Sequence, residues 1–192
     1  MKQQEVNFIE WSKRAYQCAC NHGFHDKTFS DEHWMMMTIG EVSEMVEAHR
    51  KGRFADVEAF KKSDTVNDGE FKDKFNRFVK DTVEDEMADI IIWLADYAGM
   101  NGLSVNDVLP KSLAFSQFLS KMLVSQKDDI SGLGFGLVRE LSNLNRWKET
   151  LITTVVCSVF TAAQMRNIDL SWHVEQKMRY NELRPMLNGK RY

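Results

Sequence analysis

The chain has few residues that interrupt a helix. Its 192 residues include only two prolines, Pro110 and Pro185, and ten glycines. No segment alternates apolar and polar residues for long, so a β-sheet is not expected. The sequence therefore predicts an all-α fold of long helices. We place these helices at residues 3–20, 31–51, 71–99, 105–123, 134–146, 148–166 and 170–183.

One stretch departs from this helical pattern. The polar segment KKSDTVNDGEFKDKF, from Lys61 to Phe75, contains Asn67-Asp68-Gly69, which is a typical loop sequence. We therefore expect a surface insertion in loop form between two helices.

Other scarce features exclude whole classes of protein. Three cysteines are an odd number and too few to stabilise a fold of this size through disulfide bonds, so reduced thiols are expected. The net charge of -3 gives no sign of a nucleic-acid partner. No apolar run approaches the roughly 20 residues of a membrane-spanning helix. The N-terminal sequence has no apolar core of a signal peptide either. We therefore expect one cytoplasmic domain, residues 1–192, with no membrane partner.

The segment CACNHGFH brings potential zinc ligands together at Cys18, Cys20, His22 and His25. Ligands two residues apart on a helix point to different sides, and a second distant pair is missing. A helix end followed by a loop explains this segment better than a structural zinc site.

Two acidic pairs are present within apolar helical patterns. TIGEVSEMVEAHRKGRF carries Glu41 and Glu44, and VEDEMADIIIWLADYAG carries Glu86 and Asp89, each pair three residues apart on one helix face. If the two helices pack antiparallel, four carboxylates meet and require a positive partner. Oxygen ligands of this kind suit Mg2+ or Mn2+. A solvated acidic face would explain one such pair, but two pairs beside apolar stripes favour a metal site.

A di-iron bundle is the main alternative metal site. Such sites use Glu-x-x-His on two helices. No histidine of this sequence follows a glutamate at that spacing, so the characteristic ligand is missing.

With these motifs, the sequence resembles the all-alpha NTP pyrophosphohydrolases typified by MazG and the dimeric dUTPases. The matching motifs are EVSE, EMAD, the continuation EAHRKG, and the C-terminal KMRYNELRP. The polar insertion makes the gap between the two acidic motifs longer than usual in the family. The resemblance implies a MazG-like helical bundle that hydrolyses a nucleoside triphosphate to the monophosphate and pyrophosphate, with Mg2+ held by the four acids.

The resemblance also implies roles for individual residues. Glu41 or Glu44 would help to deprotonate the attacking water. Other residues would bind the substrate: Lys177, Asn181 and Arg184 with Arg50 and Lys51 at the phosphates, and Trp93 and Asp96 at the base or sugar. If these residues have no role in binding, the basic residues belong to a solvated helix end, Trp93 belongs to the core, and Asp96 lies on the surface. Trp34, His25 and Phe24 are candidates for the pocket mouth.

The second half of the sequence resembles a degenerate copy of the first. GEVSEMVEAHR, from Gly40, aligns with GLVRELSNLNR, and EMADIIIWLADYAGMNGLSVNDVLPK aligns with ITTVVCSVFTAAQMRNIDLSWHVEQK. Three acids are replaced in the copy and one is kept: Leu137 stands for Glu41, Ile152 for Glu86, Val155 for Asp89 and Glu140 for Glu44. We therefore predict a tandem repeat that forms a pseudo-dimer in one chain. Repeat 1, about 30–120, carries the metal site, and repeat 2 spans about 130–185. Chance similarity between amphipathic helices is the alternative.

Two other functions stay open at this point. The chain is either an enzyme or a non-catalytic helical interaction or regulatory module that kept the bundle. Within the enzyme class, phosphoribosyl-ATP pyrophosphohydrolase is a further candidate. Base and sugar preference are not indicated, and further homo-oligomerisation is compatible with the sequence.

Overall fold

The computed structural model describes residues 7–62, 67–105 and 129–189, and this part of the chain is all helical, with no strand. The expectation of an all-α fold is confirmed. The helices are α1 (Phe8–Asn21), α2 (Asp31–Arg50), α3 (Val57–Lys62), α4 (Asp68–Phe78), α5 (Val83–Asn101), α7 (Ile130–Leu141), α8 (Lys148–Met165), α9 (Leu170–Glu182) and the 3-10 turn η1 (Met186–Gly189). The helix expected at 105–123 lies almost entirely outside the described residues.

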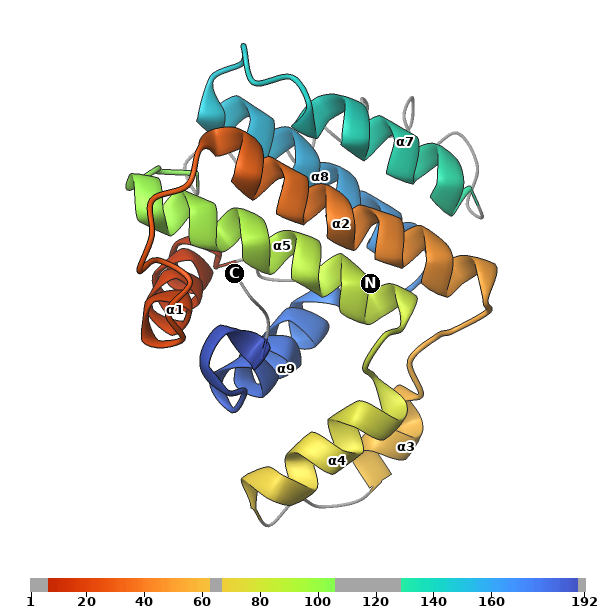
Figure 1. Cartoon of the computed structure of the whole chain (residues 1–192). Coiled ribbons are helices and arrows are strands. Elements are labelled where there is room, and N and C mark those ends of the chain that lie inside the picture. Colours follow the sequence, from red (N-terminus) through yellow and green to blue (C-terminus); the bar gives the residue numbers. More distant parts are fainter. Residues whose placement is uncertain (1–6, 63–66, 106–128, 190–192) are drawn as a thin grey trace.

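Helix α5 is the centre of the fold. It packs against α1, α2, α8 and α9, while α7 packs against α2 and α8 (Figure 1). Ile90, Ile91 and Leu94 are fully buried, as are most other residues of this helix. A helix that is apolar on nearly every side is stable only when neighbours surround it. The run IIIWLADYA therefore explains why α5 occupies the middle of the bundle.

Two glycines let helices approach α5 and α2 closely. A Cβ atom on Gly99 of α5 would lie 2.5 Å from the backbone oxygen of Ser12 in α1. A Cβ atom on Gly134 of α7 would lie 2.7 Å from Cγ2 of Val46 in α2. Both contacts place backbone against the neighbouring helix, so neither position has room for a larger side chain.

The described residues of the polar insertion, 61–62 and 67–75, are helical except for the cap residue Asn67, which corrects the loop expected at 61–75. Asn67 begins α4, because its side chain accepts a hydrogen bond from the backbone N–H of Glu70 at 2.9 Å. Phe71 and Phe75 then fall on one face of α4 and are buried. Tyr180 of α9 stacks on Phe75, with ring centroids 4.4 Å apart. Apolar residues at helical spacing outweigh the turn sequence, which acts here as an N-cap.

The continuous helix expected at 71–99 is also wrong. The chain leaves α4 at Phe78 and re-enters a helix only at Val83. Asp81 in this break has φ of 59°, outside the range of a right-handed helix. The side chain of Thr82 then caps α5 by accepting a hydrogen bond from the N–H of Asp85 at 3.3 Å. The break fixes the start of α5 and thereby the position of its first acids.

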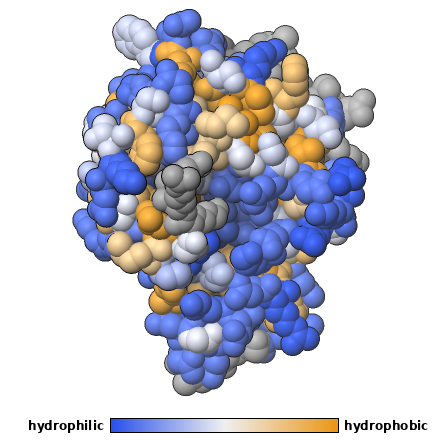
Figure 2. All heavy atoms as spheres, viewed as in Figure 1, coloured by the Kyte–Doolittle hydropathy of each residue, from blue (hydrophilic) through white to orange (hydrophobic). Residues whose placement is uncertain are grey.

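The exposed surface of the protein is mostly polar, with some apolar residues. On the face shown in Figure 2, hydrophilic side chains dominate the region of α3 and α4, and apolar side chains form separate patches. In the described part of the chain, no single helix is both long and apolar enough to cross a membrane.

Candidate functional site

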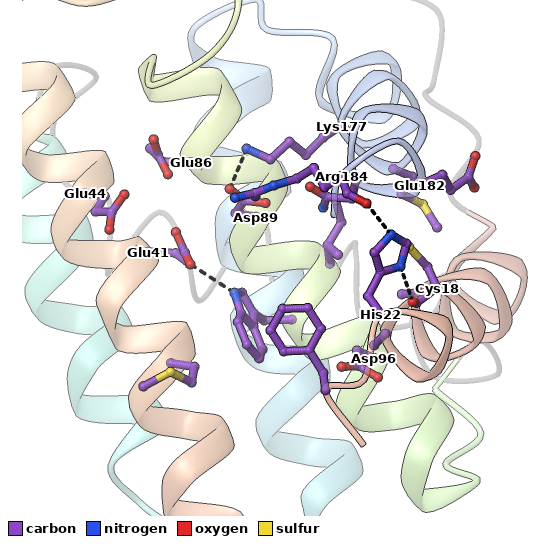
Figure 3. A pocket seen from close by; sticks show the side chains of 18 of the residues that line it. Cys18, His22, Glu41, Glu44, Glu86, Asp89, Asp96, Lys177, Glu182 and Arg184 are labelled. Atoms are coloured by element: carbon purple, nitrogen blue, oxygen red, sulfur yellow. Dashed lines mark hydrogen bonds and ion pairs between the residues drawn. The ribbon is translucent and has the colours of Figure 1, made fainter. Parts of the chain in front are cut away.

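A pocket of about 280 Å³ lies between α1, α2, α5 and the end of α9. Its volume is close to the lower end of the roughly 300–1,000 Å³ of small-molecule pockets. The two sides of the pocket differ chemically. Glu41, Glu44 and Glu86 gather on one side, and Cys18 and His22 lie on the other (Figure 3). The pocket therefore has the glutamate cluster at one end, and at the other end it has Cys18 and His22 together with Asp96 and Glu182.

Three of the four expected metal ligands meet at one end of the pocket. Glu41, Glu44 and Glu86 each offer one carboxylate oxygen, and these oxygens lie within 4.8 Å of one another. Glu41 and Glu44 are one turn apart on α2, and Glu86 lies in the first turn of α5. Acids in a first turn are favoured by the positive end of the helix dipole. Antiparallel packing of α2 and α5 brings the two motifs together, as the sequence predicted.

Proton affinities at this cluster are high. Burial raises the pKa of Glu41 to about 8, with repulsion from Asp89 and Glu44 adding to it. Burial likewise raises the pKa of Glu86 to about 9, again with repulsion from neighbouring acids. Attraction to Lys177 lowers both pKa values but only partly offsets burial and repulsion. The cluster is therefore electrostatically suited to a cation.

The fourth expected ligand, Asp89, contacts a lysine. Lys177 Nζ lies 2.6 Å from Asp89 Oδ2 and 2.8 Å from Asp85 Oδ2, and Lys177 is only 4% exposed. Burial alone would lower the pKa of Lys177, but attraction to both acids raises it. This lysine was expected at the phosphates. In the structure its ammonium group is the counter-ion of two carboxylates.

The sequence motifs did not indicate two further acids. Asp85 is buried, accepts the backbone N–H of Asp81 at 3.0 Å, and forms a second acidic group with Asp81 and Glu86. Glu84 is also buried and accepts the N–H of Ala55 at 3.0 Å. The spacing of four residues between Asp85 and Asp89 was a usable signal, because such residues share a helix face.

Trp93 and Asp96 continue the same face of α5. Trp93 Nε1 donates to Glu41 Oε1 at 3.0 Å, so the indole is tied to the acidic cluster. Asp96 is buried rather than solvated, and its Oδ1 lies 2.8 Å from His25 Nε2. Both residues line the pocket. The alternative of a surface aspartate therefore does not describe Asp96, whereas Trp93 is partly buried and also packs against the hydrophobic core.

The basic candidates divide into two groups. Asn181 and Arg184 line the pocket, and Asn181 Oδ1 is buried with no hydrogen-bond partner. Arg50 and Lys51 both pair with Glu47, at 2.7 Å and 2.9 Å. Neither is among the described residues that line the pocket. The structure therefore brings only the first group to the site.

The corresponding positions in the second half are mostly apolar and buried. Leu137, Ile152 and Val155 belong to the core. Glu140 pairs with Arg146 instead of joining a cluster. Within the described residues, both acidic groups that could hold a metal lie in the first half.

A scan against protein-family models, a search of curated proteins and a search of solved structures each found no match for this chain. The resemblance to MazG-like enzymes therefore rests on the sequence motifs alone.

Proposed function

We propose that the chain is a cytoplasmic, MazG-like nucleoside triphosphate pyrophosphohydrolase that depends on Mg2+, with Mn2+ as a substitute. The observation that carries the proposal is the meeting of three carboxylate oxygens within 4.8 Å, from Glu41, Glu44 and Glu86, in a pocket that also contains Arg184. A cation site beside a guanidinium group suits a phosphate chain.

The donor set fits the proposed metal. All three side chains offer oxygen, which Mg2+ and Mn2+ prefer, and no histidine or cysteine belongs to the acidic group. When bound, the ion neutralises phosphate charge and acidifies a coordinated water. Asp89 lines the same pocket, where Lys177 pairs with it beside the three-carboxylate group.

The protein's own residues supply the remaining functions. Glu41 or Glu44 accepts a proton from the attacking water. The water oxygen bonds to phosphorus, the bond from that phosphorus to the bridging anhydride oxygen breaks, and pyrophosphate and the nucleoside monophosphate separate. Arg184 binds phosphate oxygens through its planar fork of donors. We assign this contact to Arg184 rather than to Lys177, because two acids already hold the lysine.

The arrangement of helices supports a pseudo-dimer with one working site. In the expected repeat α7 corresponds to α2 and α8 to α5, and each corresponding pair packs together. Both pairs run antiparallel, as expected for halves related by a two-fold axis perpendicular to the helices (Figure 1). Ile90 and Leu94 of α5 and their counterparts Val156 and Phe160 of α8 are all buried. The second half thus supplies packing that a second subunit would otherwise provide.

The test is hydrolysis of a panel of nucleoside triphosphates with Mg2+, followed by identification of the products. We expect the monophosphate and pyrophosphate. Glu44→Gln should abolish turnover, whereas Glu140→Gln, the same change at the corresponding position of the second half, should leave it nearly intact. A folded protein that hydrolyses none of the panel would favour the non-catalytic module. Equal loss in both variants would contradict the single site.

A further inference from the structure

We propose that the end of the pocket around Asp96 selects nucleobases of the cytosine or adenine type, which carry an exocyclic amino group where uracil or hypoxanthine carries a carbonyl oxygen, and that Asp96 accepts a hydrogen bond from that group. The inference rests on the proposed nucleotide substrate, and it assigns the base class, which the acidic motifs do not specify. Four observations carry it: the spacing along α5, the aromatic walls, the fixed orientation of Asp96, and the chemistry of its carboxylate.

The first observation is the distance between the acidic cluster and Asp96. Glu86, Asp89, Trp93 and Asp96 all line the pocket from α5. The rise from Glu86 to Asp96 is about 15 Å, because a helix advances about 1.5 Å per residue. An extended nucleoside triphosphate has a comparable length from its phosphate chain to the edge of its base. A nucleotide whose phosphates lie at Glu86 therefore brings its base towards Asp96.

The second observation is the wall beside Asp96. Phe24 and Trp93 both line the pocket and meet edge to face, with ring centroids 6.4 Å apart. Ala15 and Ala19 of α1 line the same pocket without polar side chains. Trp93 is held by its hydrogen bond to Glu41, so its ring is pre-positioned. Rigid aromatic faces of this kind suit a flat heteroaromatic ring.

The third observation is that Asp96 is held in one orientation. Asp96 is 4% exposed, and its Oδ1 accepts a hydrogen bond from His25 Nε2 at 2.8 Å. The ring of His25 stacks on Trp34 at 4.9 Å and meets Tyr16 edge-on at 4.9 Å. The histidine is therefore fixed by two aromatic rings, and it fixes the carboxylate in turn. Burial raises the pKa of Asp96, and the hydrogen bond from His25 opposes this effect.

The fourth observation is chemical. An ionised carboxylate only accepts hydrogen bonds. Cytosine and adenine present an amino group where uracil and hypoxanthine present a carbonyl oxygen, and a carboxylate facing a carbonyl oxygen has no hydrogen to accept. A fixed, buried acceptor penalises a substrate that leaves it unpaired. In its ionised form Asp96 therefore favours the amino over the oxo member of each pair.

The experiment uses matched monophosphates, so that it does not depend on turnover. Calorimetry on the full chain compares CMP with UMP and AMP with IMP, with Mg2+ present. Whichever ring size binds, we expect the amino member to bind roughly ten- to a hundredfold more tightly than its oxo partner, the size of one good polar base contact. Equal or tighter binding of the oxo member in both pairs, or no binding of any of the four, would overturn the inference.

Two variants locate the discrimination. Asp96→Asn keeps the shape but adds a donor, so the preference should fall to within about threefold while the oxo member binds at least as well as before. Asp26→Asn removes an exposed acid next to His25 and should keep the full preference. A preference that survives Asp96→Asn in the folded protein would also overturn the inference. If the proposed hydrolysis fails, the monophosphate affinities still decide the base preference.

Discussion

At the residue scale, the acids of the pocket differ in what neutralises them. Asp85 and Asp89 share the ammonium group of Lys177, whereas no basic side chain among the described residues forms an ion pair with Glu41 or Glu86, and burial raises the pKa of both. The pocket therefore contains one internal ion pair and one cluster that is suited to an external cation.

This difference predicts a pH dependence of stability. Burial raises the pKa of Glu41 to about 8 and of Glu86 to about 9, so between about pH 4.5 and 9 these two groups bind more protons in the folded protein than in the unfolded chain. The lowered pKa of His173, about 4, acts in the opposite direction only below about pH 6.5. Stability without metal should then fall as pH rises through this window. Mg2+ should raise the melting temperature more at pH 9 than at pH 6, as thermal unfolding at both values will show. Glu86→Gln should flatten the metal-free decline. A melting temperature that rises from pH 6 to 9 without metal would contradict this electrostatic description.

The ion pair predicts a large effect of Lys177→Met. The change leaves the buried Asp85 and the partly buried Asp89 without their cation. Loss of one partner of a buried pair costs about 3–5 kcal/mol in the free energy of unfolding. Urea unfolding measures it. Lys80→Met is the matched control, because the pair of Lys80 with Asp81 is much more exposed and should contribute less than about 1 kcal/mol. Similar losses in the two variants would mean that the buried pair is not formed.

Arg184 should affect substrates and not the free metal site. Arg184→Ala removes a charge-assisted contact worth about 1.5–3 kcal/mol, which corresponds to roughly ten- to a hundredfold in kcat/KM. Arg184→Lys should restore only part of it. Steady-state kinetics gives these values, with Arg179→Ala as the control, because Arg179 pairs with Asp68 outside the pocket. Parent-like kcat/KM in folded Arg184→Ala would exclude the contact.

The acidic pairs were predictable because residues three apart share a helix face in any packing. The ion pair of Asp89 with Lys177 was not predictable from the sequence. Lys177 follows Asp89 by more than eighty residues, and only the path of α9 across α5 brings the two together. Asp96 was expected to be either a substrate contact or a solvated acid, and its burial against His25 depends on the turn after α1.

At the element scale, long apolar helices were predictable and the insertion was not. The segment from Glu86 to Ala98 contains no glycine or proline and is too long for a typical strand, which favours a helix. In contrast, α4 has buried residues mainly at Phe71 and Phe75, and it is stabilised by contact with Tyr180 of α9. A short amphipathic helix that begins at a turn sequence resembles a loop until its partner is known.

The close contact of α1 and α5 predicts that a change from glycine to alanine destabilises the fold at Gly99 but stabilises it at Gly40. Gly99→Ala forces a Cβ atom against the backbone of Ser12 and should destabilise the fold by about 1–3 kcal/mol. Gly40→Ala lies in α2 with no atom within 4 Å of the new Cβ, so it should stabilise by roughly 0.5–1 kcal/mol. Thermal or urea unfolding compares the two. Equal effects would show that α1 is not packed so closely on α5.

At the scale of the whole molecule, the two halves have different roles. The first half gathers acids around the pocket, while the counterpart positions Leu137, Ile152 and Val155 join the core. The replacement of three acids by apolar residues in the second half predicted this division, and these three apolar residues are buried in the structure. The relation between the halves as repeats stays a prediction, supported by the antiparallel helix pairs.

The most direct test of the metal site is a titration of metal-free protein with Mn2+, in which electron paramagnetic resonance reports the free ion. We expect saturable binding that Glu44→Gln weakens at least about tenfold, since it removes a charged ligand from the three-carboxylate cluster. Glu140→Gln should bind as the parent does. Absence of saturable binding in the parent, or equal binding in Glu44→Gln and the parent, would contradict a cation site at Glu41, Glu44 and Glu86.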